Sequence, residues 1–419
     1  MKKFSICFHS TVLTACAALS LTSRVAAQAT HTFLMDRHMS VVAGVSTVQT
    51  ARYLLGNLQN LIIPSRLGRE DTFGSKLGGI VFRTLKIGWL ETPQNVLETT
   101  VVHEVFGHGA RAREFGFPVS YRIDFPPPFG NGSGSTIFDR PLEIGVNVSR
   151  YEDLAITIAG IETSNMSWSR LGDQWIERGA FDYRDASRFT TAQLTSFTNT
   201  LVTSGSDGSH YIAILNGMRQ DDGKEFIDVD DFEVRSLVNL LNPLFVVALY
   251  RSAITYLFTG REVYSVPMIS LGGGVRYVGW PRYILTPFGP EWGVENLFSR
   301  NGQQLRLTFR ISDGIGASTV GGGVRVKKLF RSDRYSVDGR IEVWDQPGFN
   351  LLDRGLKTRS GGFGGALVST VRFTPDLLTR GSLVWSIVGD LGYKTAGYLE
   401  GEALDRGLVL RVGGSFRSP

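Results

Sequence analysis

Cysteine is almost missing from this sequence of 419 residues. The only two, Cys7 and Cys16, lie within the first thirty residues, so the rest of the chain can form neither a disulfide framework nor a thiolate metal site. The excess of one sign of charge over the other is also small, because 44 Lys and Arg stand against 39 Asp and Glu, and no run of five basic residues occurs. This diffuse excess excludes a nucleic-acid partner. Since only 20% of residues are charged and 42% are hydrophobic, long disorder and a coiled coil are excluded too.

Long uninterrupted apolar runs are missing as well. Residues 237–258 come nearest to a membrane-spanning helix, but Asn239, Pro243 and Arg251 interrupt them. We therefore expect a buried core helix there, which could dock the helical part of the chain on the strands.

The first 29 residues resemble an export signal. Met1–Lys3 is basic, Thr11–Leu21 is apolar, and Ala27–Ala29 has small residues at the two positions that a signal peptidase reads. We expect residues 1–29 to be a signal peptide and the protein to be exported to the outer membrane or periplasm. Leu13–Cys16 also fits a lipoprotein box, in which case Cys16 would carry a lipid anchor.

The remainder divides by its hydrophobic period. Residues 30–260 predict a mostly helical domain, and residues 261–419 predict strands. Leu305–Ser312 alternates apolar and polar residues without interruption, as a half-buried strand requires. Similar segments occur at residues 335–343, 383–393 and 408–416, and weaker ones at 271–277, 282–288, 317–326 and 364–373. The sequence thus predicts an α+β protein in which a helical, metallohydrolase-like domain precedes an antiparallel β-barrel of about eight strands.

Charged residues mark one face of these strands. Opposite the apolar positions lie Arg306, Arg310, Arg325, Arg340, Arg372 and Arg411, among many of the chain's 49 glycines. A barrel in the bacterial outer membrane, with apolar side chains toward lipid and charges inside, fits this pattern. A soluble sandwich or a lipocalin-like barrel, with the apolar face turned inward, would show the same alternation.

The candidate chemistry gathers in one helix. His103-Glu104-Val105-Phe106-Gly107-His108 contains two of the five histidines that follow the signal segment, with a carboxylate beside the first. Two imidazoles and an adjacent glutamate are the ligands and general base of a zinc hydrolase. Residues five apart are about 140° apart around a regular α-helix, too far to share an ion. The pattern therefore predicts a π-type turn between Glu104 and His108, which Gly107 would ease.

The segment His103–Gly109 resembles the zinc signature H-E-L-L-G-H-G of the dipeptidyl peptidase III family, matching at five of its seven positions. The resemblance implies that His103 and His108 bind Zn²⁺, that Glu104 is the general base, and that a glutamate some fifty residues downstream is the third ligand. Glu162, 54 residues after His108 on an expected helix, takes that place. The family's second motif, E-E-x-x-A-E, is absent, so the resemblance covers the metal site alone.

Other polar residues have two interpretations each. His210-Tyr211 could donate to the oxyanion of a carbonyl under attack, or belong to a loop that leads into a helix. Glu98 could orient a ligand histidine, and Glu152 and Asp153 could be second-layer groups, although acids in a first helical turn are common.

Two functions follow. The first is a zinc-dependent, peptidase-like hydrolase of the bacterial envelope that acts on a peptide or lipid-linked substrate, with catalytic residues Glu104, His210 and Tyr211. The second is a non-catalytic outer-membrane barrel protein whose metal site is structural or absent. A structural site would be closed by a fourth ligand, for which His210 is the candidate.

Overall fold

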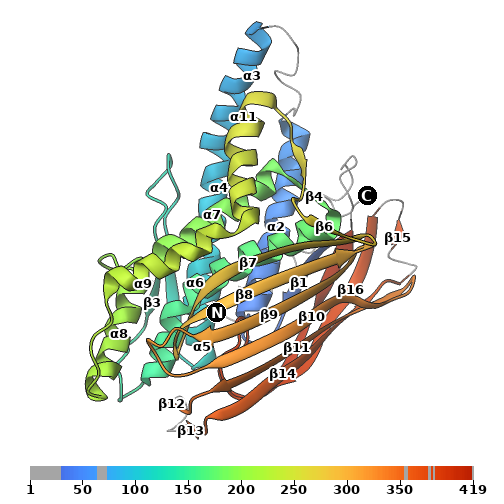
Figure 1. Ribbon diagram of the computed structural model, residues 1–419. Helices are drawn as coiled ribbons and strands as arrows, with labels where there is room; N and C mark the ends of the chain where they lie inside the picture. The colour runs from blue at the N-terminus through green and yellow to red at the C-terminus, as the bar shows by residue number, and fades with distance from the viewer. Residues whose placement is uncertain (1–29, 64–72, 353–356, 376–378, 381–382, 418–419) are drawn as a thin grey trace.

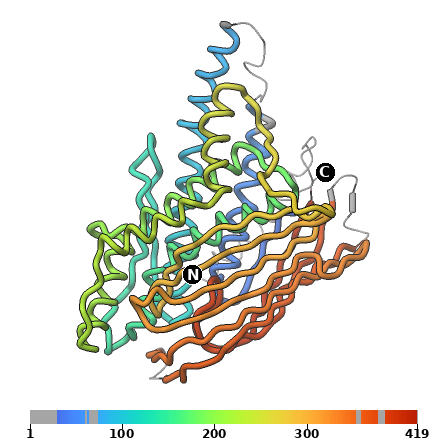
Figure 2. The backbone as a smooth tube through the Cα atoms, viewed as in Figure 1, coloured from blue at the N-terminus to red at the C-terminus, as the bar shows by residue number. Residues whose placement is uncertain are grey.

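The computed structural model describes residues 30–63, 73–352, 357–375, 379–380 and 383–417. The expected signal segment, with both cysteines and the lipoprotein box, lies outside these residues. The first half of the chain is helical as predicted, and Figure 2 shows its blue-to-yellow trace above the orange-to-red strands. The helices are α2 (Val41–Ile62), α3 (Phe73–Lys86), η1 (Ile87–Glu91), α4 (Thr92–Val101), η2 (Val102–His108), α5 (Gly109–Glu114), α6 (Arg150–Arg178), α7 (Tyr183–Thr200), α8 (Asp207–Asp221), α9 (Val229–Ser236), η3 (Leu237–Leu241), α10 (Pro243–Leu249), η4 (Tyr250–Thr255) and α11 (Tyr256–Thr259).

One large antiparallel sheet contains most of the strands (Figure 1). Its order is β1-β17-β16-β14-β11-β10-β9-β8-β7-β6, and β15 (Thr379–Arg380) pairs only with β16. The members are β1 (Thr30–Met35), β6 (Ile269–Gly272), β7 (Val275–Thr286), β8 (Gly289–Arg300), β9 (Gln303–Ser312), β10 (Val320–Arg331), β11 (Tyr335–Gln346), β14 (Gly362–Phe373), β16 (Leu383–Lys394) and β17 (Gly407–Arg417). The short pairs are β2 (Val119–Ile123) with β3 (Gly134–Phe138), β4 (Ala180–Asp182) with β5 (Val263–Ser265), and β12 (Phe349–Leu351) with β13 (Lys357–Arg359).

The predicted closed barrel of about eight strands is wrong. Within the described ranges the sheet is open, because β6 and β1 lie at its two ends and do not pair with each other. β1 comes from the helical half of the chain, and it pairs with β17 from Thr30 opposite Arg417 to Met35 opposite Val412. Alternation of apolar and polar residues shows on which face of a strand each side chain lies, but it carries no information on whether the two edge strands pair with each other. Here α6 and its neighbours occupy the concave side (Figure 1).

The sheet has apolar side chains on its outer face and charged side chains on its inner face. Register places Val324, Ile341, Leu367, Tyr393 and Leu408 side by side across five strands on the outer face, and each is at least 42% exposed. The inner face instead buries charge, including Glu291, Glu295, Arg306, Arg310, Glu342, Asp390 and Arg411. The apolar side chains therefore face outward, and the charged ones are held in ion pairs under the helices.

Helix α6 lies at the centre and positions the candidate site. It begins with a capping box, in which Ser149 accepts from the Glu152 amide and the Glu152 carboxylate accepts from the Ser149 amide, and it ends at Gly179 with φ 71°. One apolar core surrounds its N-terminal half, with Leu154 and Ile158 fully buried, and a second surrounds Trp168 and Trp175 farther along. These cores fix α6 against α7, α8 and η2.

Among the described residues, no single helix is long and apolar enough to cross a bilayer. One pair, Val229–Leu241 with Pro243–Thr259, meets the length and composition test together but is bent by 68°.

Candidate metal centre

The helix that carries His103 and His108 is widened, as predicted. Residues Val102–His108 form the π-helix η2, which brings the two imidazole centroids to 4.9 Å. Glycines also allow η2 to press on α6: a Cβ on Gly107 would lie 2.7 Å from the Ala159 carbonyl oxygen, and one on Gly160 would lie 2.3 Å from the His103 ring. The sequence therefore needs glycine at 107 for the contact between two backbones.

A third donor completes a compact cluster. His103 Nε2 lies 3.2 Å from His108 Nε2 and 3.2 Å from Asp207 Oδ2, while His108 Nε2 lies 3.4 Å from Asp207 Oδ1. Donors bound to one tetrahedral Zn²⁺ at about 2.0–2.1 Å are separated by about 3.3 Å. Asp207 Oδ2 is buried and accepts no hydrogen bond from the described residues, so an ion is the partner that fits it. The donor set and its spacing suit zinc.

The surroundings of the cluster orient His108 and keep Asp207 ionised. His108 Nδ1 lies 2.7 Å from the Ile156 carbonyl oxygen, which can only accept, so in the neutral ring Nε2 keeps its lone pair for the cluster. Burial opposes charge on His108, but Asp207 and Glu104 together raise the pKa of this imidazole to about 9. Burial likewise opposes ionisation of Asp207, yet the two histidines hold the pKa of its carboxyl well below the usual range.

Asp207 reaches the cluster from the start of α8. Ser206 caps this helix by accepting from the Ser209 amide, so Asp207 is its first residue, where the helix dipole favours a carboxylate. A Cβ on Gly208 would lie 2.2 Å from the Thr200 carbonyl oxygen, so glycine lets α8 begin directly against the end of α7. Asp207 was not among the ligands predicted from the sequence. The signal that could have identified it was its place three residues before His210 in the same helix.

Glu104 lies beside the cluster, on the same π-helix. Thr136 Oγ1 on β3 lies 2.9 Å from Glu104 Oε2 and 3.0 Å from its carbonyl oxygen, and the side chain is 9% exposed. A Cβ on Gly134 would lie 2.7 Å from Glu104 Cγ, so β3 runs directly over this glutamate. The carboxylate is thus held in place from the strand side.

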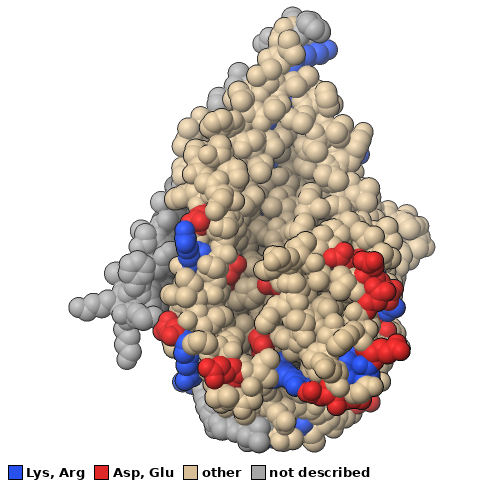
Figure 3. All heavy atoms as spheres, turned by 90° about the vertical axis from the view of Figure 1, so that its left-hand side faces the viewer, with Lys and Arg blue, Asp and Glu red and all other residues tan. Residues whose placement is uncertain are grey.

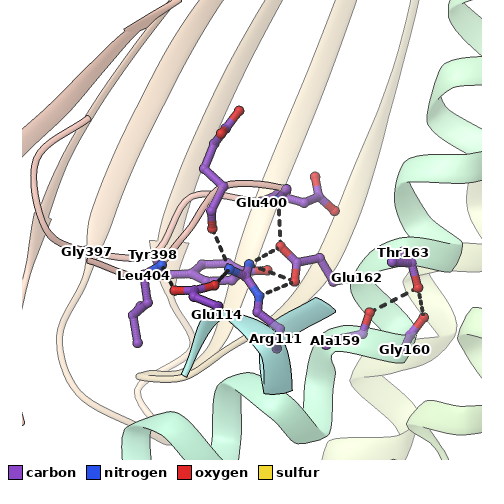
Figure 4. A network of polar contacts seen from close by, with 12 residues as sticks. Arg111, Glu114, Ala159, Gly160, Glu162, Thr163, Gly397, Tyr398, Glu400 and Leu404 are labelled. Carbon is purple, nitrogen blue, oxygen red and sulfur yellow. Dashed lines mark hydrogen bonds and ion pairs between the residues drawn. The ribbon is translucent and has the colours of Figure 1, made fainter. Parts of the chain in front are cut away.

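Glu162 does not join the two histidines. Its carboxylate pairs with Arg111, at 2.7 Å from Nη2, and accepts from the Gly401 amide in the loop between β16 and β17 (Figure 4). Gly160 faces His103, and Glu162 is about 200° farther around the helix, so it points to the opposite side. The predicted third ligand is therefore corrected: Asp207 occupies the position expected for Glu162.

The predicted oxyanion donors separate in the structure. Tyr211 is fully buried in the apolar core, and its hydroxyl donates to the Thr286 carbonyl oxygen at 2.9 Å, so its predicted catalytic role is wrong. His210 stays near the cluster, with Nε2 3.4 Å from Asp153 Oδ1 and its side chain 57% exposed. The hydrogen bond that His210 donates to Asp153 raises the pKa of His210 above its ordinary value. Successive helical residues point about 100° apart, which explains the split.

The remaining acids serve the fold. Glu98 pairs with Arg188 at 2.7 Å and thus orients an arginine, not a ligand histidine. Glu152 caps α6 and also accepts from the Leu352 amide. Asp153 is buried under His210, in the second layer around the cluster. The side of the molecule that carries α8 and β3 is visibly hollowed (Figure 3).

No family model matches the chain, and neither a curated protein nor a solved structure does. The likeness to the dipeptidyl peptidase III signature thus rests on residues 103–109 alone and stays a prediction. The case for a metal centre rests on the geometry of His103, His108 and Asp207, whose ligand atoms all lie within 4.8 Å of one another.

Proposed function

We propose that the protein is a zinc-dependent hydrolase, in which water attacks a carbonyl carbon and the adjoining amide or ester bond is cleaved. The observation that carries this proposal is the convergence of His103, His108 and Asp207: the two Nε2 atoms lie 3.2 Å apart, and each lies 3.2–3.4 Å from one oxygen of the Asp207 carboxylate. A bound zinc ion would supply Lewis acidity and lower the pKa of a water molecule. Two histidines and one carboxylate, with a fourth position open, are typical of catalytic zinc sites.

The chain's own residues have distinct roles in this proposal. Glu104, next to His103 and restrained by Thr136, accepts a proton from the attacking water and returns it to the leaving group. His210, which is held by Asp153 and whose pKa Asp153 raises, donates a hydrogen bond to the carbonyl oxygen as negative charge develops there. Tyr211 takes no part.

Two features favour catalysis over a structural site. A structural zinc site is closed by a fourth protein ligand, but the cluster found among the described residues has three. His210, the expected fourth ligand, instead pairs with Asp153. A carboxylate beside the first histidine is also needed only when water must be activated. A peptide and a lipid-linked amide or ester both suit this chemistry.

Removal of the metal tests the proposal. Purified protein is expected to contain about one zinc ion per chain, as measured by inductively coupled plasma mass spectrometry. Dialysis against a chelator should abolish hydrolysis of a panel of quenched fluorescent peptides and acyl esters, and stoichiometric zinc should restore it. Protein that is free of zinc as purified and binds none on titration would refute the metal site, and a zinc protein without activity on any member of the panel would favour the structural alternative.

We further propose that the protein works at the bacterial envelope, with the outer face of the open sheet in contact with lipid. The exposed apolar row from Val324 to Leu408 supports this location, because large apolar surfaces mark interaction sites. In Figure 3 the upper part of the molecule, where Figure 1 places α3 and α11, also shows few charged side chains.

Vesicle flotation tests this location. The wild-type protein should float with phosphatidylethanolamine–phosphatidylglycerol vesicles, and a Leu367→Glu, Leu391→Glu variant should bind them at least about tenfold more weakly, because each charge is costly in a hydrocarbon layer. Val146→Glu, at a 73% exposed position outside the sheet, is the matched control and should float normally. Equal flotation of all three proteins would contradict contact through the sheet.

A further inference from the structure

A second polar site lies between the C-terminal half of α6 and the inner face of the sheet. It is a cavity of about 220 Å³, bounded by α6 on one side and by β1, β9, β10, β11, β14, β16 and β17 on the other. A neighbouring cavity of about 470 Å³ shares Thr30, Glu177, Lys328 and Arg372 with it and lies toward the turn between β10 and β11. The two cavities are therefore adjacent.

Strand register concentrates positive charge in the first cavity. Arg306 on β9, Arg325 on β10 and Arg340 on β11 are direct cross-strand neighbours, and all three line it. Like charges in this arrangement repel each other unless anions separate them. Among the described residues that line the cavity, α6, the strands and the loop before β17 supply the carboxylates.

Arg306 and Arg340 have further carboxylate partners, Glu295 at 3.0 Å and Glu342 at 3.1 Å, so Arg325 is the least neutralised of the three. Asp173 on α6 serves three cations at once: Arg306, Arg325 at 3.7 Å and Lys327 at 3.6 Å. No other carboxylate of the described residues lies within 4.0 Å of Arg325. Burial, followed by Arg340 and Arg306, lowers the pKa of Arg325 against the opposite effect of Asp173 and Glu342.

Arg170 adds a further cation from the opposite wall. Its Nη2 donates to the Thr32 carbonyl oxygen at 3.0 Å, and it forms no ion pair within 4.0 Å with any carboxylate that the structure describes. Burial, together with Arg372 and Arg325, lowers the pKa of Arg170 to about 10 against the opposite effect of Asp390 and Asp173. A guanidinium that faces a polar cavity without a counterion is poorly neutralised.

The second cavity also has an excess of positive charge. Arg331, Arg372 and Arg417 line it, and burial followed by Arg331 lowers the pKa of Arg417. Within the described part of the chain, neither Arg331 nor Arg417 has a carboxylate within 4.0 Å. Planar guanidinium groups bind tetrahedral oxyanions through paired hydrogen bonds.

We propose that these two cavities form a binding site for a phosphate-bearing anion with two or more negative charges, held by Arg170 and Arg325 from opposite walls. The site is separate from the metal centre. Ile156 and Gly160 contact the histidines, whereas Arg170 lies ten residues beyond Gly160 on the same helix, about 15 Å along its axis. The inference therefore does not depend on the hydrolase activity.

Calorimetric titration of the purified full chain with inorganic pyrophosphate, and separately with dihexanoyl phosphatidic acid, tests the site. Arg170→Gln should weaken binding of the anion at least about tenfold, because a charge-assisted contact is lost. Arg170→Lys should bind more tightly than Arg170→Gln since it keeps the charge. Arg122→Gln, at an exposed position on β2, is the matched control and should bind as the wild type does. Circular dichroism and thermal unfolding verify that each variant is folded.

The two probes distinguish the sources of the phosphate. Binding of pyrophosphate identifies a free phosphate ligand, whereas binding of phosphatidic acid alone identifies a lipid headgroup; both outcomes support the site if they depend on Arg170. Binding of neither probe to the wild type would overturn the proposal. So would equal affinities of the wild type and a folded Arg170→Gln variant.

Discussion

Replacing Glu104 with glutamine is expected to reduce kcat about 10³-fold while the protein keeps its zinc. Glutamine has the shape of the native side chain and can still accept from Thr136, whose Oγ1 lies 2.9 Å from Oε2. It cannot take a proton from water, however, and general-base catalysis contributes about 10²–10⁴-fold. The measurements are kcat on the best substrate of the panel and the zinc content of the same sample.

Glu143→Gln is the matched control for this variant. Glu143 is an exposed glutamate on the loop after β3, so the change of charge is the same but no ligand is near. Its activity should equal that of the wild type. Full activity of Glu104→Gln would exclude the general-base role, whereas loss of zinc together with activity would assign Glu104 to metal binding.

The second large effect separates the two acids that compete for the role of third ligand. Asp207→Asn is expected to lower zinc affinity at least about 100-fold, because an amide oxygen is a poor ligand. Glu162→Gln is expected to bind zinc normally but to lose about 3 kcal/mol of stability, because buried Arg111 loses a charged partner.

Zinc titration with a competing chelator and urea unfolding of the zinc-free protein measure the two effects independently. Arg111 retains Glu114 at 2.8 Å and the Glu402 carbonyl oxygen (Figure 4), so Glu162→Gln should remain folded at low temperature. A loss of zinc affinity in Glu162→Gln and not in Asp207→Asn would restore the ligand set that the resemblance implies.

Local patterns predicted the parts of this molecule that depend on neighbours in sequence. A spacing of five between His103 and His108 required a widened turn, and η2 has it. Strict alternation in Leu305–Ser312 predicted β9. Strand β8, with Gly289-Pro290-Glu291, was not predicted. Charged and small residues occupy the positions at which an alternating strand would have apolar ones. Those residues face the buried ion pairs of the inner face.

Features that depend on distant contacts could not be predicted in the same way. Asp207 and Glu162 are both acids near a helix, and only the packing of α6 and α8 against η2 decides which one faces the histidines. The open sheet is a second example. Its closure would have required β6 to meet β1, and no periodicity within a strand encodes the distance between two edges.

The pairing of β1 with β17 has a consequence for how the chain reaches its native state. Residues 30–35 find their partners only in residues 412–417, almost the whole length of the chain away. Contacts of such sequence separation form slowly, because a very large loop must close first. Strand β1 therefore cannot pair with β17 until residues 412–417 have been synthesised. A chain of this topology is expected to depend on chaperones that shield its early segments.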